Sequence, residues 1–347
     1  MEAASIPESP TARPPRPVAR AIADNILWLL MALALVIYFI QDPKQTLDDV
    51  KTGLSNGTIW ALIALGYTLV YGIIELINFA HGEVFMIGSF VSVSLYASLG
   101  ITESTAVPVL ILGLIAVLAI SMFASGSLNV MIERVAYRPL RGAPKLAPLI
   151  TAIGMSFILQ NAGQLWRETP GTAPDLIDSQ VVVFEFLSIG VKWSDIFAVA
   201  VTAPLLFALL YFVGNTKYGK AMRATAQDPD ASRLMGIDVD RTIGLTFLLG
   251  GLLAGAAGLI YALYNGTVQY NQGFTAGLIA FTAAVMGGIG NLKGAVVGGL
   301  IIGIIQQTVE SRLDNGSAWA PAVVFAILVL VMVFRPQGLF GEETREG

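Results

Sequence analysis

The sequence predicts an all-α, polytopic integral membrane protein with eight to ten transmembrane or re-entrant helices. Of its 347 residues, 55% are hydrophobic and only 13% are charged, and the mean hydropathy is +0.72. A soluble domain carries charge on about a quarter of its residues, so this composition places most of the chain in lipid. The absence of cysteine excludes disulfides, thiol nucleophiles and thiolate metal ligands. A net charge of -4 gives no basic surface for nucleic acid, and no metal site is predicted.

Composition also predicts how the chain is organised. Residues 1–25 are rich in proline and arginine, as in PESPTARPPRP, and we expect a disordered cytoplasmic tail there. Residues 26–340 are expected to form a single transmembrane domain, and residues 341–347 a second cytoplasmic tail. The apolar run 26–40 lies too late for a secretory signal peptide and ends in QDPKQ, so we interpret it as an uncleaved first span.

Ten apolar segments are predicted within the transmembrane domain. They cover residues 26–40, 58–77, 84–99, 106–126, 146–166, 196–213, 242–264, 275–286, 295–305 and 318–334. A full crossing of the bilayer needs about 20 residues. Several segments are shorter than this, which predicts tilted, broken or re-entrant helices.

Positive charge gives an independent test of this order. Fifteen of the twenty lysine and arginine residues fall in the two tails and in the loops that share their side of the membrane. Because cytoplasmic loops collect lysine and arginine, both termini are predicted to be cytoplasmic.

The stretch INFAHGEVFMIGSF holds the only histidine of the chain, together with Asn78, Gly82 and Glu83. A charged group at the centre of the bilayer costs about 2.5–3.5 kcal/mol on insertion scales, so such residues suggest function. A structural interpretation is favoured: Asn78 and Gly82 interrupt a helix, Glu83 lies in the first turn of the next, and His81 donates a hydrogen bond that fixes the bend. A broken helix would also present these groups to a transported solute, so both interpretations stay open.

Three amides, Gln160, Asn161 and Gln164, lie in the apolar segment that ends in ILQNAGQLW. Amides in lipid form hydrogen bonds between helices worth roughly 1 kcal/mol, and this role is favoured over contact with solute.

Small residues recur four positions apart in the last third of the chain, a spacing that lets helix backbones approach closely. The glycines predicted to serve this packing are Gly251, Gly255, Gly290, Gly294 and Gly298.

The longest cytoplasmic connection, residues 215–241, is predicted to hold a short amphipathic helix broken by Pro229. Its start, GNTKYGKA, resembles the GxxxxGK phosphate-binding loop. However, it ends in Ala221 instead of the magnesium-binding Ser or Thr and follows an apolar helix instead of a strand. We therefore expect no nucleotide site and no cofactor in this chain.

The stretch around His81, with ALIALGYTLVYGI before it and ERVAYRPLRG, LITAIGMSFILQN and FTAAVMGGIGNLKGAVVGGLIIG after it, resembles a known family. It is similar to the membrane-spanning permease, of the H type, of bacterial branched-chain amino acid ABC importers. The resemblance covers about residues 53–339. It implies the ABC importer permease fold and a place in the bacterial cytoplasmic (inner) membrane.

The same resemblance implies partners. These are a second permease subunit in a heterodimer, two cytoplasmic ATPase subunits that bind the ATP, an extracytoplasmic solute-binding protein, and the lipid bilayer. It also gives the inner segment the role of a coupling helix that docks on an ATPase. The residues assigned to coupling are Tyr218, Gly219, Arg223, Ala231 and Gly236; those assigned to the translocation path are Asn78, His81, Gly82, Glu83, Gln160 and Asn161.

Alternatives remain within and outside this class. The solute could be urea, a short amide or another amino acid, because specificity lies largely in the binding protein. A proton-coupled secondary carrier that uses Glu83 or Glu75 would transport without any ATPase. An intramembrane enzyme has no nucleophile and base pair to support it.

Overall fold

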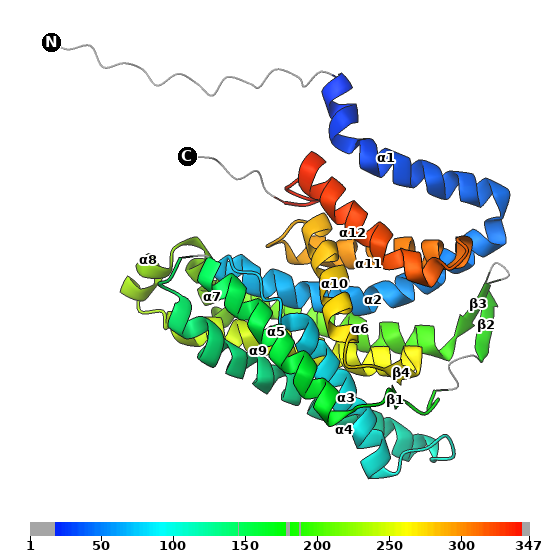
Figure 1. Ribbon diagram of the computed structural model, residues 1–347, viewed down its shortest axis with the longest axis horizontal. Helices are drawn as coiled ribbons and strands as arrows, with labels where there is room; N and C mark the ends of the chain where they lie inside the picture. The colour runs from blue at the N-terminus through cyan, green and yellow to red at the C-terminus, as the bar shows by residue number, and fades with distance from the viewer. Residues whose placement is uncertain (1–17, 145, 178–180, 187–188, 342–347) are drawn as a thin grey trace.

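The computed structural model describes residues 18–144, 146–177, 181–186 and 189–341. Its helices and strands, shown in Figure 1, are α1 (Val18–Gln41), α2 (Pro43–Ile74), α3 (His81–Leu99), α4 (Val107–Ile132), η1 (Glu133–Tyr137), η2 (Arg138–Leu140), α5 (Leu146–Trp166), β1 (Gly171–Thr172), β2 (Val182–Phe186), β3 (Ile189–Lys192), α6 (Trp193–Asn215), α7 (Lys217–Gln227), α8 (Pro229–Leu234), α9 (Val239–Asn265), β4 (Thr267–Val268), α10 (Gln272–Gly287), α11 (Leu292–Arg312) and α12 (Gly316–Phe334). Helices dominate, as the sequence predicts.

The number of membrane helices agrees with the prediction of eight to ten. Within the described residues, eight helices are long and apolar enough to cross a membrane, and α10 and the apolar part of α1, Met31–Gln41, are shorter. Eight of the ten expected segments lie wholly within one of these helices; residues 75–77 of the expected segment 58–77 follow the end of α2, and residue 106 precedes the start of α4. Helix α1 begins at Val18, before the expected start at residue 26. Residues 1–17 and 342–347 of the expected tails lie outside the described residues.

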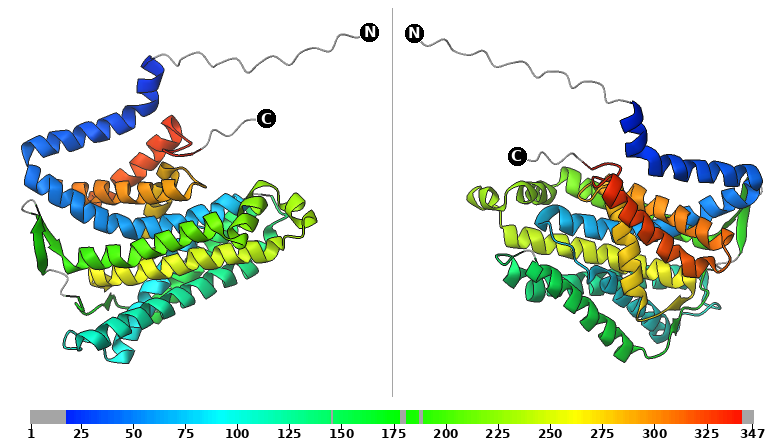
Figure 2. Two further views of the ribbon diagram at one scale, coloured as in Figure 1. Left: turned by 180° about the vertical axis from the view of Figure 1, so that it is seen from behind. Right: turned by 45° about the horizontal axis from the view of Figure 1, so that its top comes forward.

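Two helices, α2 and α9, form the centre of the bundle. Of their most apolar stretches 78% and 72% is buried, whereas only 17%, 17% and 22% is buried in α4, α6 and α12. Exposed apolar side chains such as Leu112, Phe123 and Phe207 suit a surface that faces lipid, because lipid tails solvate them as well as a protein core does. Helix α2 packs against α11, and α9 packs against α2, α3 and α4 (Figure 2).

The two ends of the bundle differ in charge. Helices α7 and α8 lie at one end and the strands at the other (Figure 1). We call the first the basic end; its described cations are Arg134, Arg138, Arg141, Lys217, Lys220, Arg223, Arg233, Arg241, Lys293 and Arg335. The opposite end holds Lys44, Lys51, Arg167, Lys192 and Arg312, and its strands form two antiparallel pairs, β1 with β4 and β2 with β3.

Glycines bring α11 and α2 into backbone contact. A Cβ atom at Gly299 would lie 2.5 Å from the Cα of Ala61, and one at Gly57 would lie 2.7 Å from the Cα of Leu300. No larger residue fits at either position without moving a backbone, so these glycines set the distance between the two helices.

Gly251 and Gly255 likewise allow the backbones of α9 and α4 to approach closely. A Cβ at Gly251 would lie 2.6 Å from the carbonyl oxygen of Ser125, and one at Gly255 would lie 2.7 Å from the Cα of Met122. The structure thus places both glycines at a close helix contact.

Of the three remaining glycines predicted to pack, two lie at a helix contact and one does not. A Cβ at Gly294 would meet the carbonyl oxygen of Gly287, and one at Gly298 would meet that of Ala283, so both lie against α10. The prediction for Gly290 is wrong: its φ is +92° and a Cβ there would meet nothing within 4 Å. Gly290 instead belongs to the turn between α10 and α11, where its positive φ requires glycine.

Candidate functional site

The membrane helix breaks between α2 and α3, close to the predicted position, but Gly82, which was expected to interrupt a helix, lies inside α3. Helix α2 ends at Ile74, and Glu75 caps it in the left-handed conformation with φ 51°. Helix α3 begins at His81 and carries Glu83 in its first turn. The six residues between the two helices would expose backbone polar groups to lipid, so side chains must satisfy some of them.

Asn78 provides this support. Its Oδ1 accepts hydrogen bonds from the backbone N–H of Ala80 at 3.1 Å and from the Tyr137 hydroxyl at 3.0 Å. Its Nδ2 donates to Oδ1 of Asn129 at 3.2 Å, and Nδ2 of Asn129 donates to the Phe247 carbonyl at 2.6 Å. Asn78 and Asn129 are buried to 99% or more. We call Asn78, Asn129 and Tyr137 the polar hub; it joins the break to α4, η1 and α9.

His81 does not fix the bend as predicted. Its side chain is fully buried, but among the described residues neither ring nitrogen has a hydrogen-bond partner of good geometry. The ring packs edge-on against Tyr67 with centroids 5.0 Å apart, and a Cβ at Gly66 would meet its Nε2. The sequence interpretation assigned to His81 a role that the Asn78 side chain performs.

Glu83 and Gly82 connect the start of α3 to two other helices. Oε1 of Glu83 accepts a hydrogen bond from the Ser156 hydroxyl of α5 at 3.2 Å, and Oε2 has no partner within the described part of the chain. A Cβ at Gly82 would lie 2.8 Å from the Cα of Gly277, and one at Gly273 would meet the Glu83 carboxylate. The first turns of α3 and α10 therefore lie side by side, with a buried carboxylate between them.

Of the two amides predicted to line the path, Gln160 lies near this site and Asn161 does not. Asn161 is exposed and its Nδ2 donates to the Phe157 carbonyl of its own helix at 2.7 Å. It therefore makes none of the expected interhelical bonds. Gln160 is half-buried and follows Ser156 by four residues, so it lies one turn further along the face of α5 that meets Glu83.

Helix α7 is anchored to the end of α6. The Arg223 guanidinium donates to the carbonyls of Val213 and Gly214, so it caps the carboxyl terminus of α6. The Tyr218 ring stacks on Phe212, with centroids 6.1 Å apart. A Cβ at Gly219 would meet backbone oxygens of the same helix end. The phosphate-loop resemblance therefore falls on a helix-to-helix junction.

Helix α8 projects from the basic end with its apolar side chains uncovered. Asp228 caps it by accepting from the backbone N–H of Ala231 at 2.9 Å, and Gly236 ends the turn with φ +82°. Between them Leu234 is 89% exposed and Met235 83% exposed. The sequence interpretation did not include these two residues, although two consecutive apolar residues beside Gly236 indicated an exposed apolar site.

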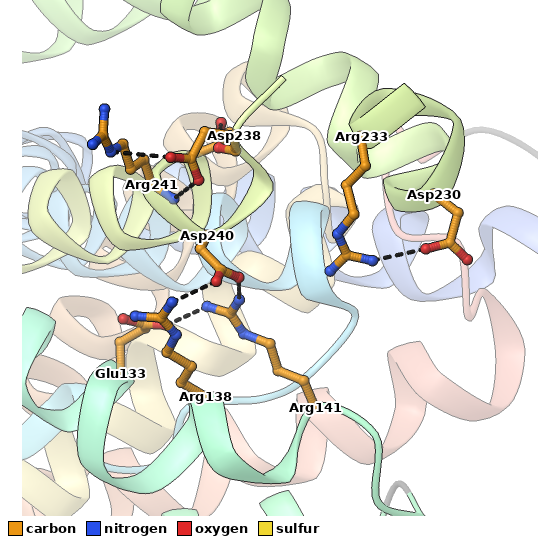
Figure 3. A network of polar contacts seen from close by, with 9 residues as sticks. Glu133, Arg138, Arg141, Asp230, Arg233, Asp238, Asp240 and Arg241 are labelled. Carbon is orange, nitrogen blue, oxygen red and sulfur yellow. Dashed lines mark hydrogen bonds and ion pairs between the residues drawn. The ribbon is translucent and has the colours of Figure 1, made fainter. Parts of the chain in front are cut away.

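An ion-pair network ties η1 and η2 to the start of α9 (Figure 3). Arg141 pairs with Glu133 and with Asp240, and Arg138 also pairs with Asp240. The Glu133 side chain is only 3% exposed, so Arg141 compensates a buried charge. Within the described residues no three carboxylate or histidine side chains are grouped to hold a metal ion.

Comparison with known proteins places this chain in a family. The family model described as branched-chain amino acid transport system / permease component matches residues 50–332. The permease protein BraD of the high-affinity branched-chain amino acid transport system of Pseudomonas aeruginosa is 42% identical over 301 residues, which are 85% of this chain and 95% of BraD. LivH of Escherichia coli K12, a permease of the same kind of system, is 40% identical over 88% of this chain and 96% of its own length. A probable LivH from Methanocaldococcus jannaschii is 27% identical over 82% and 89%. The chain is a multi-pass membrane protein that belongs to the branched-chain amino acid permease family.

Proposed function

We propose that this chain is the membrane-spanning permease subunit of an ATP-binding-cassette importer for branched-chain amino acids. Family membership and the names of BraD and LivH support the solute class. In this proposal it pairs with a second, similar permease subunit, and an extracytoplasmic binding protein delivers the solute. Two cytoplasmic ATPase subunits bind and hydrolyse the ATP. The chain lies in the bacterial cytoplasmic membrane with its basic end and both termini in the cytoplasm.

One observation carries the coupling role: α8 presents exposed apolar residues and is mechanically joined to a membrane helix. Leu234 and Met235 are exposed, and α8 lies at the outermost point of the basic end (Figure 1). A short helix with apolar residues docks in a groove of a partner protein. Arg223 links α7, which precedes α8, to the last carbonyls of α6. In this proposal, movement of the docked helix is transmitted to α6 through α7.

The break between α2 and α3 remains the proposed lining of the path. The hydrogen-bonding groups of Asn78 are engaged in the polar hub, so its part is to hold the broken helix. The groups without partners are His81 and one oxygen of Glu83, with Gly82 at the close contact to α10. Gln160 lies on the adjoining face of α5. Asn161 is removed from this set, since its side chain faces away and bonds to its own helix.

The test is uptake of labelled leucine by proteoliposomes that contain both permeases, the ATPases and the binding protein. We expect uptake to require ATP and to survive a protonophore. Leu234→Ser combined with Met235→Ser is expected to lower uptake at least tenfold. The matched control is Leu313→Ser, an exposed apolar residue (46% exposed) at the opposite end, and it should transport normally.

Two results would contradict the proposal. Uptake by the permease alone, driven by a proton gradient, would establish a secondary carrier. Full uptake by the double serine variant would remove α8 as the docking element. Competition for uptake by urea, short amides and other amino acids decides among the solutes.

A further inference from the structure

A polar pocket opens at the opposite end of the bundle from α7 and α8. It has a volume of about 510 Å³, within the range of roughly 300–1,000 Å³ typical of small-molecule sites. It lies between α2, the ends of α9 and α11, and the starts of α10 and α12. The polar residues that line it and enter the argument are Trp60, Gln272, Gln306 and Glu310. The sequence analysis assigned no role to any of the four.

Three lining side chains each carry a buried polar atom without a hydrogen-bond partner in the described part of the chain. These atoms are Nε1 of Trp60, Nε2 of Gln272 and Oε1 of Gln306. The Trp60 side chain belongs to a residue that is only 4% exposed. Buried polar groups are nearly always paired, so two donors and one acceptor at a single pocket are free to bind the polar groups of a ligand there.

Glu310 gives the pocket a negative charge that the protein leaves uncompensated. Its Oε1 accepts a hydrogen bond from Gln306 Nε2 at 2.9 Å, and it forms no ion pair with a described residue. The nearby cation, Arg312, is engaged by Asp49 and Thr46 at 3.0 and 2.9 Å. A half-buried carboxylate without a cation attracts a positively charged group from outside the chain.

The floor of the pocket is apolar. Ala276 and Ile279 of α10 are 4% and 3% exposed, and both line the pocket with Pro321 of α12. One carboxylate, N–H donors and an apolar wall are the complement of a zwitterionic α-amino acid with an apolar side chain. A sugar, urea or a fatty acid carries no positive charge that could pair with Glu310.

We propose that this pocket binds the transported amino acid on its way into the membrane. Glu310 and Gln306 Oε1 accept from the α-ammonium group, and Trp60 Nε1 and Gln272 Nε2 donate to the α-carboxylate. The aliphatic side chain lies on Ala276 and the neighbouring α10 surface. This inference rests on the proposed function and assigns its solute a binding site.

The pocket adjoins the broken helix. Gln272 lines the pocket, and the next residue, Gly273, packs on the Glu83 carboxylate. A solute held at Gln272 is therefore separated from the start of α3 by a single turn of α10. This continuity places the pocket at the entrance to the proposed path.

The experiment measures binding of tritiated leucine to the assembled permease and ATPase complex in nanodiscs, without binding protein. Glu310→Gln removes the charge, and Trp60→Phe removes only the N–H while it keeps an aromatic ring. Each is expected to weaken leucine binding by roughly ten- to a hundredfold, the loss of a charge-assisted hydrogen bond. Glu103→Gln, at an exposed carboxylate between α3 and α4, is the matched control and should bind leucine as the wild type does.

Leucine analogues separate the two halves of the site. Glu310→Gln should not weaken binding of 4-methylpentanoate, which lacks the amino group. Trp60→Phe should not weaken binding of 3-methylbutylamine, which lacks the carboxylate. A crossed pattern of this kind is not produced by general damage to the fold, and it therefore distinguishes direct contact from loss of structure.

Three outcomes would overturn the inference while leucine transport by the wild-type complex leaves the proposed function intact. They are unchanged leucine affinity in both variants, no leucine binding by the wild-type complex without binding protein, and poor assembly of Glu310→Gln with normal affinity in the assembled fraction. The last would make the pocket a contact between permease subunits. Failure of the wild-type complex to transport leucine would instead refute the proposed function.

Discussion

Asn129→Leu tests whether the polar hub holds the broken helix. Asn129 is fully buried in α4 and bonds to two other parts of the chain, Asn78 in the break and the Phe247 carbonyl of α9. Leucine branches at Cγ as asparagine does, is somewhat larger and favours helix, so the substitution removes the two hydrogen bonds and keeps the branched shape of the side chain.

The expected cost follows from these contacts. Side-chain hydrogen bonds between membrane helices contribute about 1 kcal/mol each, so the loss of two costs about 2 kcal/mol. The amide of Asn78 is left without its acceptor in a water-free site, which can raise the total to about 4 kcal/mol. At about 2 °C for each kcal/mol, the lower end for large domains, the melting temperature should fall by about 4–8 °C.

The assay is the melting temperature of the purified complex in nanodiscs, with Asn161→Leu as the control. Both variants exchange an asparagine for leucine within a membrane helix, but Asn161 is exposed and bonds only to its own helix. Asn161→Leu should therefore stay within about 1 °C of the wild type, because surface substitutions rarely exceed about 0.5 kcal/mol. Equal shifts for the two variants would refute the reasoning, because residue type and not the hub contacts would then determine stability.

Two further substitutions test the packing and the charges. Gly299→Ala is expected to destabilise the bundle by about 1–3 kcal/mol, the cost of overpacking, because the added Cβ would lie 2.5 Å from the Cα of Ala61; the melting temperature measures it. Arg141→Gln is expected to cost about 3 kcal/mol, the lower end for a broken buried pair, because it leaves the buried Glu133 carboxylate without its cation. Adding Glu133→Gln should recover much of that loss in the same assay.

Each of these has a control on the same kind of residue. Gly154 of α5 is a helix glycine with open space at its Cβ position, so Gly154→Ala should be neutral or stabilising, by up to about 1 kcal/mol. Arg233 pairs with Asp230 on the surface, where the side chains are 56% and 89% exposed, so Arg233→Gln should cost less than about 1 kcal/mol. If either control destabilises as much as its test variant, the buried contact is not the cause.

The helices and the break could be predicted from the sequence because lipid leaves a chain few options. Every backbone group must be bonded within the segment, so an apolar run becomes a helix, and a polar, glycine-containing interruption becomes a break. This logic predicts a break at Asn78 and Gly82 with Glu83 in the first turn of the next helix; in the structure the break covers residues 75–80 and Gly82 lies in α3. The alternation of basic loops likewise gave the two ends of the bundle.

The partners of the break could not be predicted, because they lie far along the chain. Asn78 and Asn129 are 51 residues apart, and nothing local distinguishes Asn129 from Asn161, although one faces the centre and the other faces outward. The four-residue spacing likewise gave a wrong prediction for Gly290, which lies four residues before Gly294 but belongs to a turn. A helical repeat gives the neighbours on one face, but tertiary packing decides what that face meets.

Helix α10 joins the features that the sequence left separate. Its first turn lies against the start of α3 through Gly273 and Gly277, and the same turn contributes Gln272 to the polar pocket. Its far end passes into the glycine turn that includes Gly290, which borders a cavity shared with Arg223 of α7 at the basic end. Close glycine contacts leave no empty space between the helices, so a tilt of α10 would displace the residues at these sites together. We therefore expect a displacement of α10 to alter the polar pocket and the start of α3 together.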